Sequence, residues 1–481
     1  MSRKDKAIDD PRVDVSMQTG ELLLEEPVPH AAPTTSLIYG LEAVPPITET
    51  IFAALQHVLA CFVGIVTPSL IIGGALQLPP ETVAYLVSMS LFVSGIATFI
   101  QVKRIGPVGS GLLSVQGTSF AFIGPIIAAG GAAAAAGATP EQALGTIFCM
   151  CFAGSFIEMF LSRFLQFASK IITPLVTGTV VALIGLTLIN TGITAMGGGP
   201  GARAAADGSF GSPQNLGLAA LVLIMIVVLN SASNVFLRMA SIAIALITGY
   251  IVAFFMGMVD LSNLGNAPLF SLPIPFRFGF GFDIVAFIPF AFLFLITTIE
   301  SIGDLTATSA ISGEPIEGPV YMRRIKGGVL GDGVNSLIAA IFNTFPNTTF
   351  SQNNGVIQLT GVGSRYVGLF IAGFFLLAGL FPIIGGVIQA VPQPVLGGAT
   401  LIMFGSVATA GIRILSTINF TKRSAIILAT SLGLGVGVTY APDLLEQMPT
   451  LVKSIFSSGI STGGITALVL NMLLPGRSEA D

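Results

Sequence analysis

The segment 346–361 reads PNTTFSQNNGVIQLTG, which is partly apolar but too interrupted to form an ordinary membrane-spanning helix. The segment 111–125, GLLSVQGTSFAFIGP, has the same character. Both place hydroxyl and amide side chains beside glycine and proline, which break helices. Because unpaired backbone groups are costly in hydrocarbon, a broken backbone persists at membrane depth only where it faces protein or a water-filled cavity. The two segments therefore indicate a membrane protein with two broken helices.

The composition agrees with a membrane protein. Hydrophobic residues make up 53% of the 481 residues and charged residues only 9%, with a mean hydropathy of +0.89. An average soluble domain carries roughly 25% charged residues. These values exclude soluble enzymes, nucleic-acid binders and secreted disulfide-rich modules. The three cysteines lie in apolar stretches and indicate neither a disulfide framework nor a metal site.

Long apolar runs occupy most of the chain. A spanning helix needs about 20 predominantly apolar residues. Twelve such runs lie near residues 50–74, 79–101, 143–165, 171–196, 216–236, 240–259, 283–311, 325–344, 365–391, 394–412, 424–441 and 454–475. With the two interrupted segments counted as half-spanning elements the total is fourteen. We therefore expect an all-α polytopic membrane protein with 14 transmembrane segments.

The interrupted segments hold matching positions, because they are the third and the tenth of these fourteen elements. Each is thus the third element of a seven-span half, and an odd number of spans makes the two halves inverted relative to each other. Broken segments in corresponding positions of two halves point to the binding site of a transporter. The alternative is a pair of re-entrant loops that are packed for structure alone.

The basic residues predict the orientation. With the N-terminus inside, only Arg203, Arg277 and Lys453 fall on the outer side. We expect a multi-pass protein of the inner (plasma) membrane with both termini in the cytoplasm. The polar segment 1–47 has no basic region directly before an apolar run, so we expect a cytoplasmic tail rather than a cleavable signal peptide.

Three carboxylates fall at membrane depth. Glu300 and Asp304 are four residues apart and so share one helical face. Asp332 lies in the next span, within GGVLGDG at 327–333. Intramembrane carboxylates are candidates for function, and a proton-coupled carrier needs a carboxyl that binds and releases a proton. A structural hydrogen bond to a helix end is the alternative for Asp332, and Glu158 is interpreted as structural.

Two further side chains extend this candidate site. His57 lies in the middle of the first span, where it either packs as a hydrogen-bonded residue or orients a carboxylate and helps to carry a proton. Gln352 both donates and accepts hydrogen bonds, whereas an ionised carboxylate only accepts. Glutamine, asparagine and glutamate together can recognise a flat ring with alternating donors and acceptors. A simple inorganic anion would instead require positive charge.

The sequence QNNGVIQLTG at 352–361 resembles the signature of the nucleobase–ascorbate transporters, also called nucleobase–cation symporters, in its purine-type form. The resemblance extends over about residues 45–475. It includes Gln56-His57, Ser114-Val115-Gln116, Glu300 with Asp304, and Gly331-Asp332-Gly333.

The resemblance implies seven-plus-seven inverted repeats, short antiparallel strands in the broken third and tenth segments, a homodimer, and an elevator-like movement of a core domain against a gate domain. The core domain takes 48–165 (spans 1–4) and 280–391 (spans 8–11). The gate domain takes 166–265 (spans 5–7) and 392–475 (spans 12–14). Cytoplasmic tails take 1–47 and 476–481.

The resemblance also implies residue roles. Glu300 and Gln352 would hydrogen-bond the base, Phe120 would stack on it, and backbone groups near Ser119, Phe120 and Ser351 would complete the site. Asp304, Asp332, His57 and Asn353 would support proton coupling. No catalytic residue, metal or cofactor is expected, and the coupling ion is a proton. The expected partners are a purine base, the lipid bilayer and a second copy of the chain, without nucleic acid.

The leading hypothesis is therefore a proton-coupled importer of xanthine, uric acid or both. Ser119 differs from the asparagine of strict xanthine carriers, whereas Asp304 favours a xanthine-type site. Ascorbate carriers have proline at the position of Gln352, and uracil carriers have histidine at the position of Asp304. A symporter for uracil or another nucleobase, and an anion exchanger of the related sulfate-carrier fold, remain the alternatives. An intramembrane enzyme is disfavoured because no HExxH motif or paired Ser and His is present.

Overall fold

The computed structural model describes residues 37–165, 173–205, 208–234, 237, 241–259, 270, 273–316, 318–381, 390–416, 418–449, 452, 456 and 458–474. The predicted C-terminal tail and most of the predicted N-terminal tail lie outside these residues. The helices of the first half are α1 (Ile47–Ala75), α2 (Pro80–Lys103), α3 (Ile123–Ala135), α4 (Pro140–Leu161), α6 (Pro174–Met196), α7 (Gly199–Ala205), α8 (Pro213–Asn230) and α10 (Ser241–Phe255). Those of the second half are α11 (Ile284–Ile311), α12 (Gly318–Ile341), α13 (Ser351–Thr360), α14 (Arg365–Leu380), α16 (Gln393–Leu415), α17 (Lys422–Tyr440) and α19 (Gly459–Leu473).

Most of these helices are suited to a membrane. Among the described residues, 8 helices are long and apolar enough to cross one, namely α1, α2, α4, α6, α8, α11, α16 and α17. Shorter apolar helices cover 120–135, 241–255, 365–380 and 459–473. The 24-residue helix α12 is long enough to span, but Arg324, Lys326 and Asp332 make it more polar. The chain is therefore a multi-pass, mostly helical membrane protein.

Each broken segment contains a short strand. Strands β1 (Gln116–Thr118) and β2 (Asn347–Thr349) pair antiparallel, with Gln116 opposite Thr349. A turn of 3-10 helix, η1 (Phe120–Phe122), joins β1 to α3, and β2 leads directly into α13. The pairing continues past the strands, because the backbone N–H of Ser119 donates to Pro346 O at 2.8 Å and that of Phe350 donates to Val115 O at 3.0 Å.

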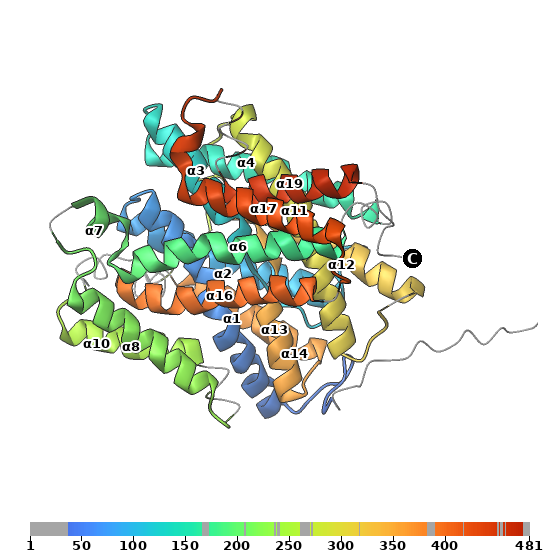
Figure 1. The fold of residues 1–481 in the computed structure, drawn as a ribbon. Coiled ribbons are helices and arrows are strands. Elements are labelled where there is room, and N and C mark those ends of the chain that lie inside the picture. The colour runs from blue at the N-terminus through green and yellow to red at the C-terminus, as the bar shows by residue number, and fades with distance from the viewer. Residues whose placement is uncertain are drawn as a thin grey trace, which may run out of the picture.

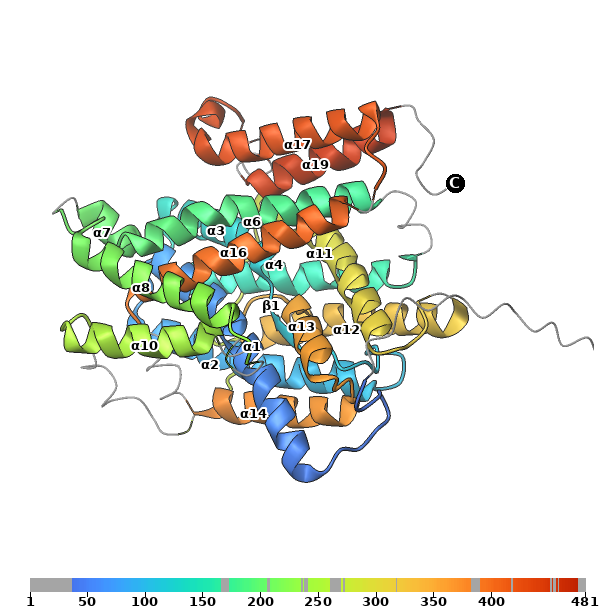
Figure 2. The ribbon, with the colours of Figure 1, turned by 60° about the horizontal axis from the view of Figure 1, so that its bottom comes forward.

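Glycine lets the strands pack closely on their surroundings. A Cβ built on Gly117 would lie 2.4 Å from Cζ of Phe350, which is closer than van der Waals contact allows. The sheet residues are all buried. Helices α1 and α2 pack against β1, and α11 and α12 pack against β2, so four long helices enclose the sheet. Figure 2 shows β1 in the interior of the molecule, between α4 and α13.

Among the described helices, α6 and α16 share the most extensive contact and run side by side (Figures 1 and 2). Small residues make this possible, as is common between membrane helices. A Cβ on Gly185 would lie 2.2 Å from the backbone nitrogen of Ala408, and one on Gly411 would lie 2.2 Å from that of Ala182. The two helices therefore touch through their backbones at two places.

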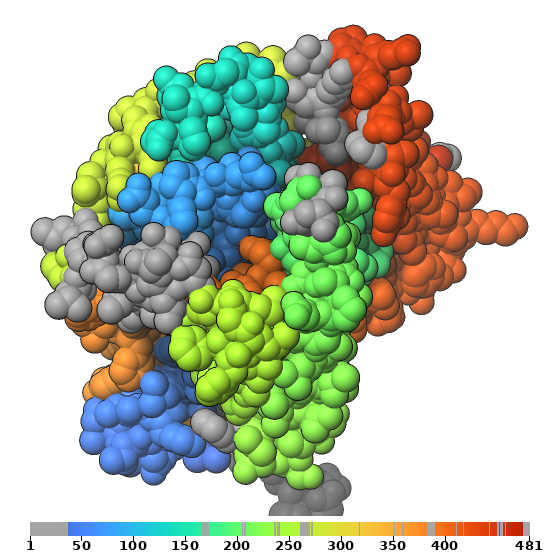
Figure 3. Space-filling view, turned by 90° about the vertical axis from the view of Figure 1, so that its left-hand side faces the viewer, coloured from blue at the N-terminus to red at the C-terminus, as the bar shows by residue number. Residues whose placement is uncertain are grey.

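The other helices pair in a regular way. Helix α2 packs on α14 and α12 packs on α4, while α8 pairs with α10 and α17 pairs with α19. The α17–α19 pair lies against α6, and the α8–α10 pair lies against α16. Figure 3 shows one face of the molecule, on which blue and green helices border a hollow that exposes orange residues of the second half.

Candidate functional site

Asp332 is the centre of a buried hydrogen-bond network beside the sheet. Its side chain is 0% exposed. Gln101 Nε2 donates to Oδ1 at 2.6 Å, Ser301 Oγ donates to Oδ2, and Thr349 Oγ1 donates to Oδ2 at 3.1 Å. These donors come from α2, α11 and β2. One carboxyl group therefore joins α12 to three other elements, of which α2 is distant in sequence.

The same network reaches β1. Gln116 Nε2 donates to Thr349 Oγ1 at 3.0 Å, and Asn335 Nδ2 donates to Gln116 Oε1 at 3.4 Å. Gln101 is also bonded on both sides of its amide, since it donates to Gly328 O and accepts from the backbone N–H of Ser110, each at 2.8 Å. All of these hydrogen bonds are buried, and a buried polar group that lost its partner would reduce the stability of the fold. The network thus fixes how the two broken segments sit between α2 and α12.

Glu300 lies one residue before Ser301 and is half-buried on α11. Its Oε2 atom is buried and has no hydrogen-bond partner among the described residues. Asp304 is half-buried one turn further along the same helix. One further turn along α11, Thr308 Oγ1 donates to Asn354 Oδ1 at 2.6 Å, which joins α11 to α13. The face of α11 that carries the two carboxyls therefore packs beside α13, the helix that contains QNNGVIQLTG.

His57 of α1 and Asn353 of α13 lie together where these two helices pack. The His57 ring is 0% exposed on α1 and lies within interaction range of the Asn353 side chain. Neither ring nitrogen makes a well-formed hydrogen bond within the described part of the chain. Asn353 Nδ2 donates to Leu113 O at 2.6 Å. These contacts join α1, the first broken segment and α13, and both side chains are packed away from solvent.

Phe120, Ser119 and Gln352 have different surroundings. Phe120 is 9% exposed and meets Phe404 of α16 edge to face, with ring centroids 5.7 Å apart at 87°. Ser119 is buried, and its Oγ has no partner among the described residues. Gln352 is exposed in the first turn of α13. The side chain of Ser351 lies outside what the structure describes.

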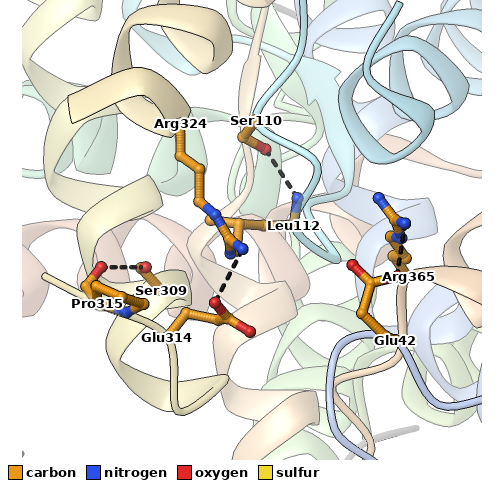
Figure 4. A network of polar contacts seen from close by, with 8 residues as sticks. All are labelled: Glu42, Ser110, Leu112, Ser309, Glu314, Pro315, Arg324 and Arg365. Atoms are coloured by element: carbon orange, nitrogen blue, oxygen red, sulfur yellow. Dashed lines mark hydrogen bonds and ion pairs between the residues drawn. The ribbon is translucent and has the colours of Figure 1, made fainter. Parts of the chain in front are cut away.

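A second group of polar contacts lies at the ends of α11, α12 and α14 (Figure 4). Arg324 pairs with Glu314 at 2.8 Å, and Arg365 pairs with Glu42 at 2.5 Å. The backbone N–H of Arg365 also donates to Leu41 O at 3.0 Å, so residues before α1 are held against the start of α14. These ion pairs stabilise the connections around the helices rather than the Asp332 network.

The structure thus brings four of the predicted residues close to the broken segments. Asp332 is bonded to Ser301, the residue after Glu300, and His57 lies beside Asn353. Sequence reasoning did not single out Gln101, Ser301 or Thr349 as partners of Asp332. Gln101 stands out only as an amide within an apolar run, and Ser301 only as the neighbour of Glu300. Gln101 is more than two hundred residues from Asp332 in the chain, and none of the three contacts follows from helix or strand spacing, so one sequence does not reveal them.

A multi-pass bundle with two broken helices that meet beside buried carboxyls defines a membrane transporter rather than an enzyme. A family model described as "Permease family" (Xan_ur_permease) matches residues 48–444. The chain belongs to this family, the nucleobase–ascorbate transporters.

Characterised relatives share this length. The chain is 49% identical over 446 residues to the xanthine permease XanP of Escherichia coli K12, covering 92% of this chain and 96% of the relative. It is 46% identical over 442 residues to the xanthine permease XanQ of the same organism, covering 92% and 94%. It is 35% identical over 430 residues to the uric acid permease PucJ of Bacillus subtilis, covering 89% and 93%.

Solved structures with the same fold are much more distant in sequence. The transmembrane domain of the cyanobacterium bicarbonate transporter BicA has a TM-score of 0.58 at 14% identity, covering 85% of this chain and 98% of that one. The murine anion transporter Slc26a9 in the inward-facing state has a TM-score of 0.59 at 13% identity, covering 90% and 69%. These likenesses establish a transporter fold and carry no information on the substrate.

Proposed function

We propose that this protein is a proton-coupled secondary transporter that imports xanthine, uric acid or both. The observation that carries the proposal is the contrast between the Glu300 carboxyl and the Asp332 hydrogen-bond network next to it. Glu300 keeps a buried oxygen without a hydrogen-bond partner among the described residues, while its neighbour Ser301 is tied to Asp332. A group that is held in place but left unsatisfied is suited to bind a substrate or a proton.

The chemistry of the side chains supports an oxidised purine. Such a base is flat and carries N–H donors and carbonyl acceptors around its edge. Glu300 accepts from an N–H group, and the amide of Gln352 both donates and accepts. The ring of Phe120 offers an aromatic face or edge to a planar base. The relatives named as xanthine and uric acid permeases favour the same substrate class.

We further propose fourteen spans arranged as two inverted halves. Counted along the chain, α2 and α14 are the second and eleventh elements, and α12 and α4 are the ninth and fourth. A shift of seven elements exchanges the first pair with the second, and both pairs are packed together. The same shift exchanges the α8–α10 pair with the α17–α19 pair. This regular packing is what an inverted repeat would produce.

An elevator movement follows from that arrangement. The core domain would comprise 48–165 and 280–391, and the gate domain 166–265 and 392–475. The α6–α16 contact would form the rigid backbone of the gate, and the core would carry the substrate past it. We also propose a homodimer in the inner membrane with both termini in the cytoplasm. The excess of lysine and arginine in the loops on the predicted cytoplasmic side supports this orientation.

The anion-exchanger alternative draws on the fold likeness to BicA and Slc26a9. Among the described side chains, the candidate site offers carboxyl, amide, hydroxyl and aromatic groups and no cation. An inorganic anion would be repelled by Glu300 and Asp304 unless both were protonated. A nucleobase remains the better match, with uracil disfavoured for the reasons given above.

Uptake of radiolabelled xanthine and urate into cells that lack their own carriers tests the proposal, with and without a proton uncoupler. We expect uptake of at least one purine and its loss when the uncoupler is present. Purine uptake that is insensitive to the uncoupler would contradict proton coupling. Uptake of bicarbonate or sulfate without purine uptake would favour the anion exchanger.

A further inference from the structure

Glu158 is a buried carboxyl group that the substrate site does not use. It lies near the C-terminal end of α4 and is 1% exposed. Both of its carboxyl oxygens are buried without a hydrogen-bond partner in the described part of the chain. A buried polar group without a partner is costly, and an ionised one far more so. A packing role would be served by an apolar side chain, so this glutamate needs another explanation.

The packing of α4 locates Glu158 between two other helices. Gly154, one turn earlier on the same helical face, lies against Phe294 of α11, since a Cβ there would be 2.3 Å from Cδ2 of that ring. The next residues touch α12, because a Cβ on Gly333 would lie 2.9 Å from the backbone nitrogen of Met159. Glu158 thus sits where α4, α11 and α12 meet.

This junction brings Glu158 close to the candidate site. Its carboxyl interacts electrostatically with those of Asp332 and Glu300. Of the helices that pack on α4, α3 carries no titratable residue and α11 carries Glu300 and Asp304. Helix α12 carries Asp332 and three cations near its start, Arg323, Arg324 and Lys326. Among the described residues, the carboxyl of Glu158 therefore has other carboxyls as its charged neighbours and forms no ion pair.

A buried apolar cluster includes residues of α11 and α12 near these groups. It consists of residues one turn beyond the site on α11 and α12 together with neighbouring loop residues, namely Leu41, Leu112, Leu165, Leu305, Ile325 and Val329. All six are buried. Ile325 and Val329 stand between Arg324 and Asp332 in the sequence of α12, and Leu305 follows Asp304 on α11.

Two buried carboxyls in one junction have opposite surroundings. Asp332 accepts hydrogen bonds from Gln101, Ser301 and Thr349, which suits an ionised carboxylate. Glu158 has no donor among the described residues and has negative charge nearby, which suits a neutral carboxylic acid. Contrasting environments of this kind divide roles between two acidic groups. Of the two, Asp332 has the surroundings better suited to a negative charge, and Glu158 has those better suited to a proton.

We propose that Glu158 is a proton-binding site of the transport cycle, which holds a proton while the substrate site is empty and exchanges it with Glu300 when a purine binds or leaves. In this exchange the O–H bond on Glu158 breaks as an O–H bond on Glu300 forms, and the reverse follows later. The total charge of the carboxyls is unchanged by the step. The inference rests on the proposed proton-coupled function.

Glu158→Gln tests the proposal, because it keeps the shape of the side chain and fixes it in a neutral form. We expect proton-driven net xanthine uptake to fall by about tenfold or more, the factor that corresponds to one unit of proton affinity. Exchange of internal for external xanthine, which needs no net proton movement, should fall far less. Glu141→Gln, the same change at an exposed position in the first turn of α4, is the matched control.

The outcomes separate the two proposals. Wild-type uptake that resists the uncoupler would overturn proton coupling itself. Coupled wild-type uptake with equal net uptake by Glu158→Gln would overturn only the role of Glu158, as would an equal loss of net uptake and exchange. If Glu158→Gln does not reach the membrane, Glu158→Asp replaces it, and its pH profile of net uptake should shift. An unchanged profile for Glu158→Asp would contradict the proposal.

Discussion

Gln101 Nε2 donates a 2.6 Å hydrogen bond to Asp332 Oδ1, and the two residues come from helices in opposite halves of the chain. Gln101 lies on α2, which packs against β1, and Asp332 lies on α12, which packs against β2. Each therefore helps to fix the sheet against the helix that contains the other. This contact ties the architecture of the broken segments to the carboxyls beside them.

Gln101→Leu should destabilise the protein. The substitution removes a donor from a buried carboxylate and leaves Ser110 N–H and Gly328 O without their partner. We expect a loss of about 1–3 kcal/mol in the free energy of unfolding, the usual cost of an unsatisfied buried group. Thermal unfolding in detergent measures it, with exposed Gln447→Leu as the control. Equal unfolding temperatures for the two variants would show that the network contributes nothing to stability.

Gln352→Glu should weaken purine binding by about 1–3 kcal/mol, because the carboxylate loses the donor capacity of the amide. Glu300→Ala should abolish uptake. Direct binding of radiolabelled xanthine to the purified protein gives the affinity, and Gln447→Glu controls for the added charge. Unchanged affinity in Gln352→Glu would count against direct contact by that side chain, and full uptake by Glu300→Ala would refute its assignment.

Gly185→Ala should disturb the α6–α16 contact, since the new methyl group would lie 2.2 Å from the backbone of Ala408. Overpacking of this kind costs about 1–3 kcal/mol. Gly405→Ala is the matched control on α16, where an added Cβ meets nothing within 4 Å. Both the amount of folded protein recovered from the membrane and its unfolding temperature should be lower for Gly185→Ala than for Gly405→Ala. The reverse order would mean that α6 and α16 do not pack through Gly185.

A crosslink between α3 and the start of α19 should stop an elevator movement. A Cβ on Gly124 would lie 3.9 Å from Oγ of Ser458, so cysteines at both positions are close enough for a disulfide. In a background without Cys61, Cys149 and Cys151, oxidation should abolish uptake and a reductant should restore it.

The control crosslink joins two positions within the proposed core. A Cβ on Gly363 would lie 3.6 Å from Oγ of Ser312. Oxidation of cysteines at these positions should leave uptake largely intact. If the Gly124–Ser458 crosslink forms and uptake continues at the uncrosslinked rate, the movement of core against gate is ruled out.

The sequence allowed the membrane setting, the two broken segments and the carboxyls to be predicted, because each leaves a local mark. Proline and glycine beside polar residues marked the segments around Gln116 and Thr349, and Glu300 and Asp332 interrupted apolar runs. The partners of Asp332 left no such mark, since Gln101 and Thr349 reach it only through tertiary packing. Glu158 was interpreted as structural for the same reason: only the packing of α11 and α12 against α4 shows that it has no hydrogen-bond partner among the described residues.

The central claim is that purine movement carries protons through a site built on Glu300. The most direct test is to reconstitute the purified protein in liposomes that contain a pH-sensitive dye and to add xanthine or urate outside without a pH gradient. We expect acidification of the interior that depends on the purine and is absent in Glu300→Ala. Purine accumulation without any change in internal pH would contradict proton coupling.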